Sequence, residues 1–179
     1  MGRMLELLRE GDRRTTAGSA EAARWARVNP RDAAELVDLL AYRIAAVRMR
    51  AADALEKASA QNTALLAPYK ALLLDLAEDT MQPELRWHLA QLLPRLDLDA
   101  EEVRDAASLF LRWYKRDSSA VVRTFVLQGL MDLTRQDHGL LAETEAVTIQ
   151  ALASPTPSLK ARARKVKLEL DRLKADPGD

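Results

Sequence analysis

Cysteine is absent from the 179-residue sequence, which excludes disulfides, thiolate metal sites and cysteine nucleophiles. This absence fits a cytoplasmic protein, which is the location we expect. Glycine and proline are scarce, at six and seven residues, and leave little room for the tight turns of an all-β protein. The uninterrupted apolar runs are only a few residues long, so we expect no membrane-spanning segment.

Aromatic residues make up only 4% of the sequence, against 48% for all hydrophobic residues. The core must therefore be built mainly from leucine, alanine and valine, and the composition favours helices. Acidic and basic residues number 27 each, so the formal net charge is zero. A dedicated nucleic-acid-binding protein is usually more basic, although the net charge does not exclude a local basic patch.

The two histidines, His88 and His138, lie fifty residues apart in the sequence. Neither has a carboxylate or a second histidine at metal-ligand spacing on a helix. Glycine-rich phosphate loops are also absent. The sequence therefore predicts no metal, no cofactor and no catalytic centre.

One pattern recurs four times along the chain. Its copies begin at residues 47, 85, 122 and 159, which are 38, 37 and 37 residues apart. Each copy opens with an aliphatic residue followed by a basic one, and the first three place small or aliphatic residues at offsets four, five, seven and eight. These offsets fall on one side of a helix, so each copy predicts a helix that packs by that side. The opening pairs are Val47-Arg48, Leu85-Arg86, Val122-Arg123 and Leu159-Lys160.

A second amphipathic segment precedes each copy and predicts the first helix of a pair. Breaks before the helices are indicated by Asn29-Pro30, Pro83, Asp97–Asp99, Pro155 and Pro157, and the weakest boundary lies near residues 42–45. The apolar stripes of the first helices are Leu36, Val37 and Leu40; Leu65, Tyr69, Leu72 and Leu76; Val103, Ala107, Phe110 and Tyr114; and Ala142, Ala146, Ile149 and Leu152.

A less regular pair opens the chain, with Met4, Leu5 and Leu8 on a first helix, a turn at Gly11-Asp12, and a second helix from Arg13 to Val28. The whole chain, residues 1–179, is thus predicted to be one all-α domain. Its five helix pairs cover approximately residues 1–28, 29–60, 61–97, 98–137 and 138–175, followed by a frayed tail, residues 176–179.

The segment Val47-Arg48-x-x-Ala51-Ala52-x-Ala54-Leu55 resembles the consensus of the HEAT-repeat family, although the period is slightly shorter than usual for that family. The resemblance implies a short right-handed α-solenoid whose second helices line a concave surface. HEAT units often carry an aspartate six residues before the signature arginine, and Asp117 with Arg123 fits that spacing. The equivalent residues elsewhere are Tyr42, Thr80 and Ser154, so an aspartate ladder is mostly missing.

The resemblance predicts two groups of functional and structural residues. Offsets two, three and six of the second helices would face a partner on the concave surface: Met49, Arg50, Asp53, Trp87, His88, Gln91, Thr124, Phe125 and Gln128. A structural ladder that hydrogen-bonds across turns between repeats would comprise Arg48, Arg86, Asp117, Arg123 and Lys160. A partly exposed tryptophan is typical of an interface hot spot, but Trp87 and Phe125 could instead fill gaps between neighbouring second helices.

Three functions remain open at this point. The first is a non-catalytic scaffold or adaptor that binds a protein or peptide. The alternative is nucleic-acid binding or DNA-glycosylase-like activity through a basic concave cleft. Alkylpurine DNA glycosylases use a HEAT-like solenoid in this way, but no motif in this sequence carries over their catalytic residues. Residues 157–174 carry seven basic and two acidic side chains, which suits either a binding surface or a solvated cap. The third is an accessory to an enzyme, as in bilin lyases with HEAT-like repeats.

Overall fold

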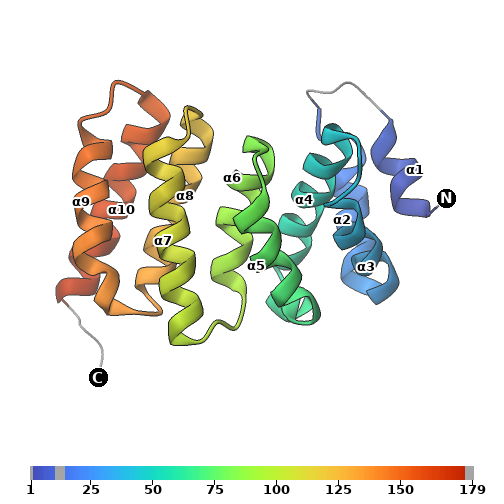
Figure 1. Cartoon of the computed structure of the whole chain (residues 1–179), viewed down its shortest axis with the longest axis horizontal. Helices are drawn as coiled ribbons and strands as arrows, with labels where there is room; N and C mark the ends of the chain where they lie inside the picture. Colours follow the sequence, from blue (N-terminus) through green and yellow to red (C-terminus); the bar gives the residue numbers. More distant parts are fainter. Residues whose placement is uncertain (1, 11–14, 176–179) are drawn as a thin grey trace. The chain divides into compact units, whose positions relative to one another are not determined.

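The computed structural model describes residues 2–10 and 15–175, which are helical apart from short connections (Figure 1). No strand occurs in this part of the chain, so the all-α class is confirmed. The helices are α1 (Arg3–Arg9), α2 (Ser19–Val28), α3 (Pro30–Leu39), α4 (Ala45–Ser59), η1 (Thr63–Tyr69), α5 (Lys70–Asp79), α6 (Pro83–Leu92), η2 (Leu93–Arg95), α7 (Ala100–Arg116), α8 (Ala120–Thr134), η3 (His138–Leu140), α9 (Leu141–Leu152) and α10 (Pro157–Ala175).

The start of α2 differs from the sequence-based expectation. The predicted turn at Gly11-Asp12 lies outside the described residues, as do the predicted start at Arg13 and the tail, residues 176–179. Within the described part, α2 begins at Ser19, after Gly18 with a φ of 79°. A Cβ atom on Gly18 would lie 2.6 Å from the backbone oxygen of Leu7. Glycine is required here because both the left-handed conformation and the close approach exclude a side chain.

Several other helix starts follow the capping signals in the sequence. The side chain of Asn29 accepts a hydrogen bond from the backbone N–H of Arg31, and proline follows at the first helical position of α3. Asp99 and Glu102 form a reciprocal capping box at the start of α7. The uncertain boundary near residues 42–45 is a real break, because α3 ends at Leu39 and α4 begins at Ala45.

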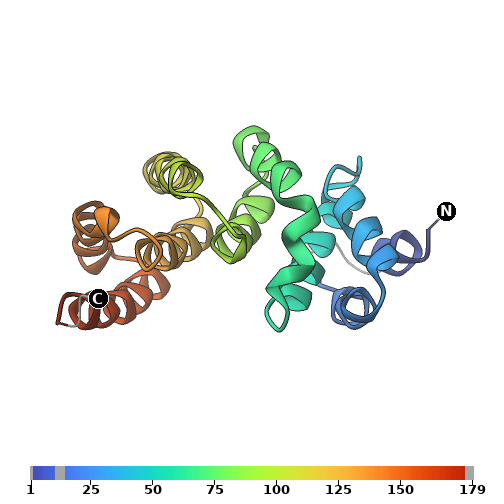
Figure 2. The same cartoon turned by 90° about the horizontal axis from the view of Figure 1, so that it is seen from below.

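The helices form two compact units, Met1–Leu96 (unit 1) and Asp97–Asp179 (unit 2). In unit 1, α4 packs against α1, α2, α3, η1 and α6. In unit 2, α8 packs against α7, α9 and α10, and Figure 2 shows α7 and α9 on one side of this unit with α8 and α10 on the other. Each of the five ranges expected from the sequence holds two α-helices, while their grouping into one domain of five repeats stays a prediction.

The core positions of the recurring pattern are confirmed. All the residues at offsets zero, four, five, seven and eight of the first three copies are buried. In α10 the buried stripe is Leu159, Ala163, Val166 and Leu170, while Arg164 is exposed. The sequence pattern therefore selects the packed side of α4, α6, α8 and α10.

The stripes expected for two first helices were wrong. On η1 and α5 the buried residues are Leu66, Leu73 and Ala77, and Leu72 is 44% exposed. Residues 63–69 form a 3₁₀ helix with Pro68 inside, and its tighter winding changes which residues share a side.

On α9 the buried side carries Thr144, Val147, Thr148 and Ala151, and Ile149 is exposed. The two threonines can be buried because each hydroxyl is hydrogen-bonded. Thr144 Oγ1 lies 2.8 Å from Thr134 Oγ1, and Thr148 Oγ1 donates to the backbone oxygen of Thr144 at 2.7 Å. The sequence pattern misses this side because it counts threonine as polar.

Among the described residues, none of the helices has the length and apolar character needed to cross a membrane.

A buried arginine fastens α1 to α4. Arg50 is 1% exposed, and its Nη1 donates to the backbone oxygens of Leu8 and Glu10 at 2.8 and 2.7 Å. Its Nε donates to the backbone oxygen of Thr15 at 2.9 Å. The last carbonyl oxygens of α1 have no N–H donors within the helix itself. The guanidinium group of Arg50 supplies these missing donors.

We expect the Arg50→Ala variant to lose about 2–4 kcal/mol of unfolding free energy, because it leaves several carbonyl oxygens without their charged donor. Urea denaturation followed by circular dichroism measures the loss. Arg24→Ala is the control, because Arg24 is an exposed arginine on α2 and its removal should change stability by less than about 0.5 kcal/mol. Equal stability of the two variants would contradict the structural role of Arg50.

Candidate functional site

The expected partner-binding residues of α4 are buried in unit 1. Met49, Arg50 and Asp53 are all buried, and α4 is covered by its neighbours. The Asp53 carboxylate accepts a hydrogen bond from Ser19 Oγ at 2.6 Å and forms an ion pair with Lys57. These contacts tie α2 to α4, and the burial leaves the three side chains little surface for a partner.

The expected residues of α6 differ in exposure. Trp87 and Gln91 are half-buried, whereas His88 is only 6% exposed. The rings of Trp87 and His88 lie 5.6 Å apart at 55°. Gln91 Nε2 donates to the backbone oxygen of Trp87 at 3.1 Å, while the indole N–H of Trp87 has no hydrogen-bond partner among the described residues. Trp87 therefore offers both a partly exposed apolar ring and an open donor.

In unit 2, the expected residues Thr124, Phe125 and Gln128 lie on α8. Thr124 is buried, and its hydroxyl donates to the backbone oxygen of Ala120 at 2.7 Å. Gln128 Oε1 accepts from Arg162 Nη1 of α10 at 2.9 Å. Phe125 is half-buried. The Gln128 contact thus links α8 to α10. A residue that the sequence placed on the partner-binding face therefore has a packing role.

The five ladder residues are in three kinds of environment. Arg48 Nη1 donates to the backbone oxygen of Tyr42 at 2.8 Å, and Arg86 Nε donates to that of Thr80 at 3.1 Å. Each arginine thereby binds the carbonyl six residues before it. Lys160 is half-buried near the start of α10. Asp117 and Arg123 are in a third kind of environment.

Arg123 departs from the pattern of Arg48 and Arg86. Asp117 Oδ1 accepts from the backbone N–H of Ser119 at 2.8 Å, and among the described residues no hydrogen bond or ion pair joins Asp117 to Arg123. The Nε atom of Arg123 is buried and has no hydrogen-bond partner in the described part of the chain. A buried donor without an acceptor costs about 1–3 kcal/mol, so this position calls for an explanation.

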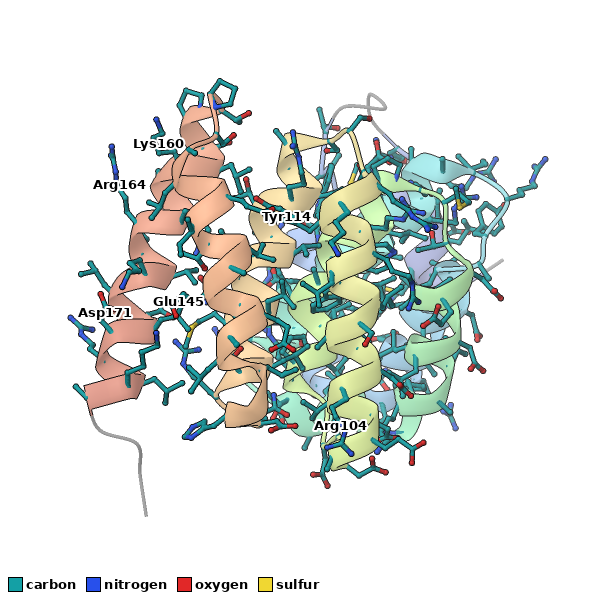
Figure 3. The ribbon with its side chains drawn as sticks, turned by 60° about the vertical axis from the view of Figure 1, so that its left-hand side comes forward. Arg104, Tyr114, Glu145, Lys160, Arg164 and Asp171 are labelled. Atoms are coloured by element: carbon teal, nitrogen blue, oxygen red, sulfur yellow. The ribbon has the colours of Figure 1, made fainter. Side chains whose placement is uncertain are left out.

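Arg123 lines a cavity of about 400 Å³ in unit 2, a volume within the usual range of small-molecule sites. Its lining comes from the ends of four helices and the connection between α9 and α10: Tyr114, Lys115, Arg123, Gln150, Ser154, Pro155 and Leu159. Figure 3 shows Tyr114 and Lys160 at the same end of the unit, with Arg104 at the opposite end.

Tyr114 is 9% exposed, and its hydroxyl has no hydrogen-bond partner among the described residues. Burial raises the pKa of Tyr114, and the nearby Arg123 charge lowers it by less. The phenol therefore stays protonated at neutral pH and can donate a hydrogen bond. The cavity thus combines two cationic side chains with a neutral donor.

Sequence reasoning did not single out Tyr114, Lys115, Gln150 or Ser154 as site residues. One signal was available at Tyr114, which lies nine residues before the signature Arg123. The residues nine before Arg48 and Arg86 are Leu39 and Ala77, both buried. A tyrosine at this core position carries a hydroxyl group that needs a hydrogen-bond partner or access to solvent.

No group of three or more metal-binding side chains occurs in the described ranges. Comparison with known proteins finds no family model, no curated protein and no solved structure that matches the chain. The relation to HEAT-repeat proteins therefore rests on the sequence pattern alone.

The burial of His88 predicts a dependence of stability on pH. Desolvation lowers the pKa of His88 from 6.5 to about 4, and the carboxylates of Asp53, Glu56 and Glu84 only partly offset it. Its Nδ1 is buried without a hydrogen-bond partner among the described residues. The unfolded chain therefore takes up a proton at a higher pH than the folded chain does, and stability falls as the pH drops from about 6.5 to about 4.

We expect this histidine to cost up to about 3 kcal/mol of unfolding free energy between pH 7 and pH 4. Urea denaturation of the wild type and of His88→Leu at several pH values isolates its share, because the carboxylates titrate in both proteins. His138→Gln is the matched control, since His138 is exposed, and it should keep the wild-type profile. A His88→Leu profile that parallels the wild type would refute this account.

Proposed function

We propose that this chain is a non-catalytic binding scaffold that recognises a protein or peptide on the concave face of a HEAT-like solenoid, which its second helices line. In this proposal the five helix pairs form a short right-handed solenoid of the HEAT type, and the protein works in the cytoplasm. The support from the structure is the direct packing of successive second helices within each unit. In unit 1, α2 packs on α4 and α4 on α6, and in unit 2, α8 packs on α10.

Trp87 is the observation that carries the proposal. It projects from a second helix, stays half-buried, and keeps an indole N–H without a partner among the described residues. Tryptophan is enriched at interface hot spots because it offers a large rigid apolar surface together with one donor. Gln91, one turn along α6, is also half-buried and would extend the same contact surface.

The alternative, nucleic-acid binding with glycosylase-like chemistry, has weaker support. It would draw on a carboxylate near Trp87, for which Asp53 is the candidate. Asp53 is buried and already engaged by Ser19 and Lys57. The carboxylate is therefore occupied by contacts that hold α2 and α4 together, and the zero net charge of the chain also favours a protein partner.

We expect peptides selected from a phage-displayed library against the full chain to depend on Trp87. Trp87→Ala should weaken their binding by about tenfold or more, the effect of a hot-spot residue, as measured by calorimetry. Leu72→Ala is the control, because Leu72 is an exposed apolar residue on a first helix of the same unit. Circular dichroism checks that both variants stay folded. Selected peptides that bind Trp87→Ala as tightly as they bind the wild type would contradict the proposal.

Duplex DNA provides the test against the alternative function. The scaffold proposal predicts no submicromolar binding of a labelled 20-base-pair duplex, even at low salt. Submicromolar binding that weakens steeply towards physiological salt would reveal an electrostatic footprint on the phosphates and would favour the nucleic-acid function. Fluorescence anisotropy at two salt concentrations distinguishes these results.

A further inference from the structure

We propose that the cavity lined by Tyr114, Lys115 and Arg123 binds the phosphate group of a phosphate monoester. The cavity lies entirely within unit 2, whereas Trp87 lies in unit 1, so the two proposals are independent. Arg48 and Arg123 hold equivalent positions in the recurring pattern, so their surroundings can be compared directly.

In unit 1, Arg48 has an acceptor for its Nε that comes from the next copy of the pattern. Gln82 Oε1 accepts from Arg48 Nε at 2.7 Å, and Gln82 Nε2 donates to the backbone oxygen of Ala45 at 3.0 Å. Gln82 lies three residues before Leu85 and immediately before Pro83, the first residue of α6. Its side chain therefore binds both Arg48 and the backbone at the start of α4.

In unit 2, the equivalent of Gln82 is Thr156. It lies three residues before Leu159 and immediately before Pro157, the first residue of α10. Threonine is two heavy atoms shorter than glutamine along the side chain and carries no amide oxygen. Arg123 Nε has no acceptor among the described residues, and the Arg123 side chain lines a cavity of about 400 Å³. An oxygen atom of a ligand in this cavity would bind the guanidinium group of Arg123, as Gln82 Oε1 binds that of Arg48.

The donors of the cavity determine the charge of this ligand. Arg123 and Lys115 are cationic, and the lining residues include no carboxylate. The neutral hydroxyl of Tyr114 adds a third donor that has no partner in the described part of the chain. Two positive charges and several donors match a dianionic phosphate group better than a carboxylate, which has one charge and two oxygens.

The size and the apolar lining indicate that the phosphate is part of a larger molecule. The side chains of Leu159 and Pro155 and the ring of Tyr114 border the cavity and can cover an organic group. A phosphate monoester satisfies both requirements, since its phosphate binds the donors and its organic part contacts these side chains. Such a group occurs in small metabolites and on phosphorylated side chains.

Isothermal titration calorimetry of the full chain with inorganic phosphate and with phenyl phosphate, at constant ionic strength, tests the proposal. We expect a dissociation constant of about 1 mM for inorganic phosphate, tighter binding of phenyl phosphate, and weaker binding of acetate. No heat from either phosphate, or acetate binding as tight as phosphate binding, overturns the proposal.

The Thr156→Gln variant tests the geometry, because it restores the residue that stands beside Arg48. Its amide should occupy the ligand's place, lowering the affinity for phenyl phosphate by about tenfold or more and raising the melting temperature by about 2–4 °C. Ser108→Gln introduces the same side chain at an exposed position of α7 and should leave both values unchanged. Wild-type affinity in Thr156→Gln overturns the proposal.

Two further variants separate a specific site from general attraction of anions. Arg123→Gln should abolish phenyl phosphate binding, and Tyr114→Phe should weaken it several-fold. Arg164→Gln removes an equal charge from an exposed position of α10 and should bind as the wild type does. Equal losses of phenyl phosphate affinity in Arg123→Gln and Arg164→Gln would show that binding follows the net charge alone, and would contradict a specific site.

A phosphotyrosine peptide and its unphosphorylated form then distinguish the two sources of the phosphate group. Binding of the phosphorylated peptide alone, with loss in Thr156→Gln, assigns the cavity to a modified protein side chain. Binding of phenyl phosphate but not of the peptide assigns it to a small molecule. Binding of both peptides with equal affinity contradicts recognition of phosphate.

Discussion

The close packing of α2, α4 and α6 is the constraint on which the rest of unit 1 depends. The contact faces are rich in alanine, with Ala22, Ala23 and Ala26 on α2 and Ala51, Ala52, Ala54 and Ala58 on α4, all buried. Small side chains let helix axes approach closely, which leaves little space for water between the helices. Polar groups on these helices must then find partners within the protein. The Arg50 contacts to α1 and the Asp53 contact to Ser19 follow from this requirement.

The recurring arginine shows how one residue type can serve two purposes. At Arg48 and Arg86, the backbone oxygen six residues earlier accepts a hydrogen bond from the guanidinium group. These contacts stabilise the turn between the paired helices. Arg123 holds the same position in the pattern, but among the described residues it has no such contact, and its Nε atom has no acceptor. The acceptors of the Nε atoms differ as well. Arg48 Nε binds Gln82 Oε1, and Arg86 Nε binds the backbone oxygen of Thr80. Arg123 has neither kind of acceptor among the described residues, and it lines a cavity.

The sequence could predict the elements that depend on local periodicity. It identified the packed side of α4, α6, α8 and α10, because small and aliphatic residues recur there at helical spacing. It also located the start of α7, because Asp99 and Glu102 form their capping box within one turn. In both cases the deciding interactions lie close together in the sequence or repeat regularly.

The sequence could not predict what depends on neighbouring elements. Offsets alone placed Arg50 of α4 and His88 of α6 on a partner-facing side. In the structure, α4 packs against α1, α2, α3, η1 and α6, and both side chains are buried. The 3₁₀ helix before α5 shifted its buried side, and hydrogen-bonded threonines reversed that of α9. Arg123 holds the same position in the pattern as Arg48 and Arg86, but its Nε has no acceptor among the described residues, so the pattern could not reveal this difference.

In the two proposals, the units offer partners different kinds of contact. In unit 1, Gln91 binds the backbone and Asp53 is paired with Lys57, while the indole N–H of Trp87 has no partner among the described residues. A partner on that surface gains mainly from covering the indole ring, so its affinity should follow apolar area and shape. In unit 2 the cavity keeps donors that the protein itself does not satisfy, so affinity there should follow the charge and the number of acceptor oxygens of the ligand. Changes in salt concentration should accordingly affect ligands of unit 2 far more than ligands of unit 1.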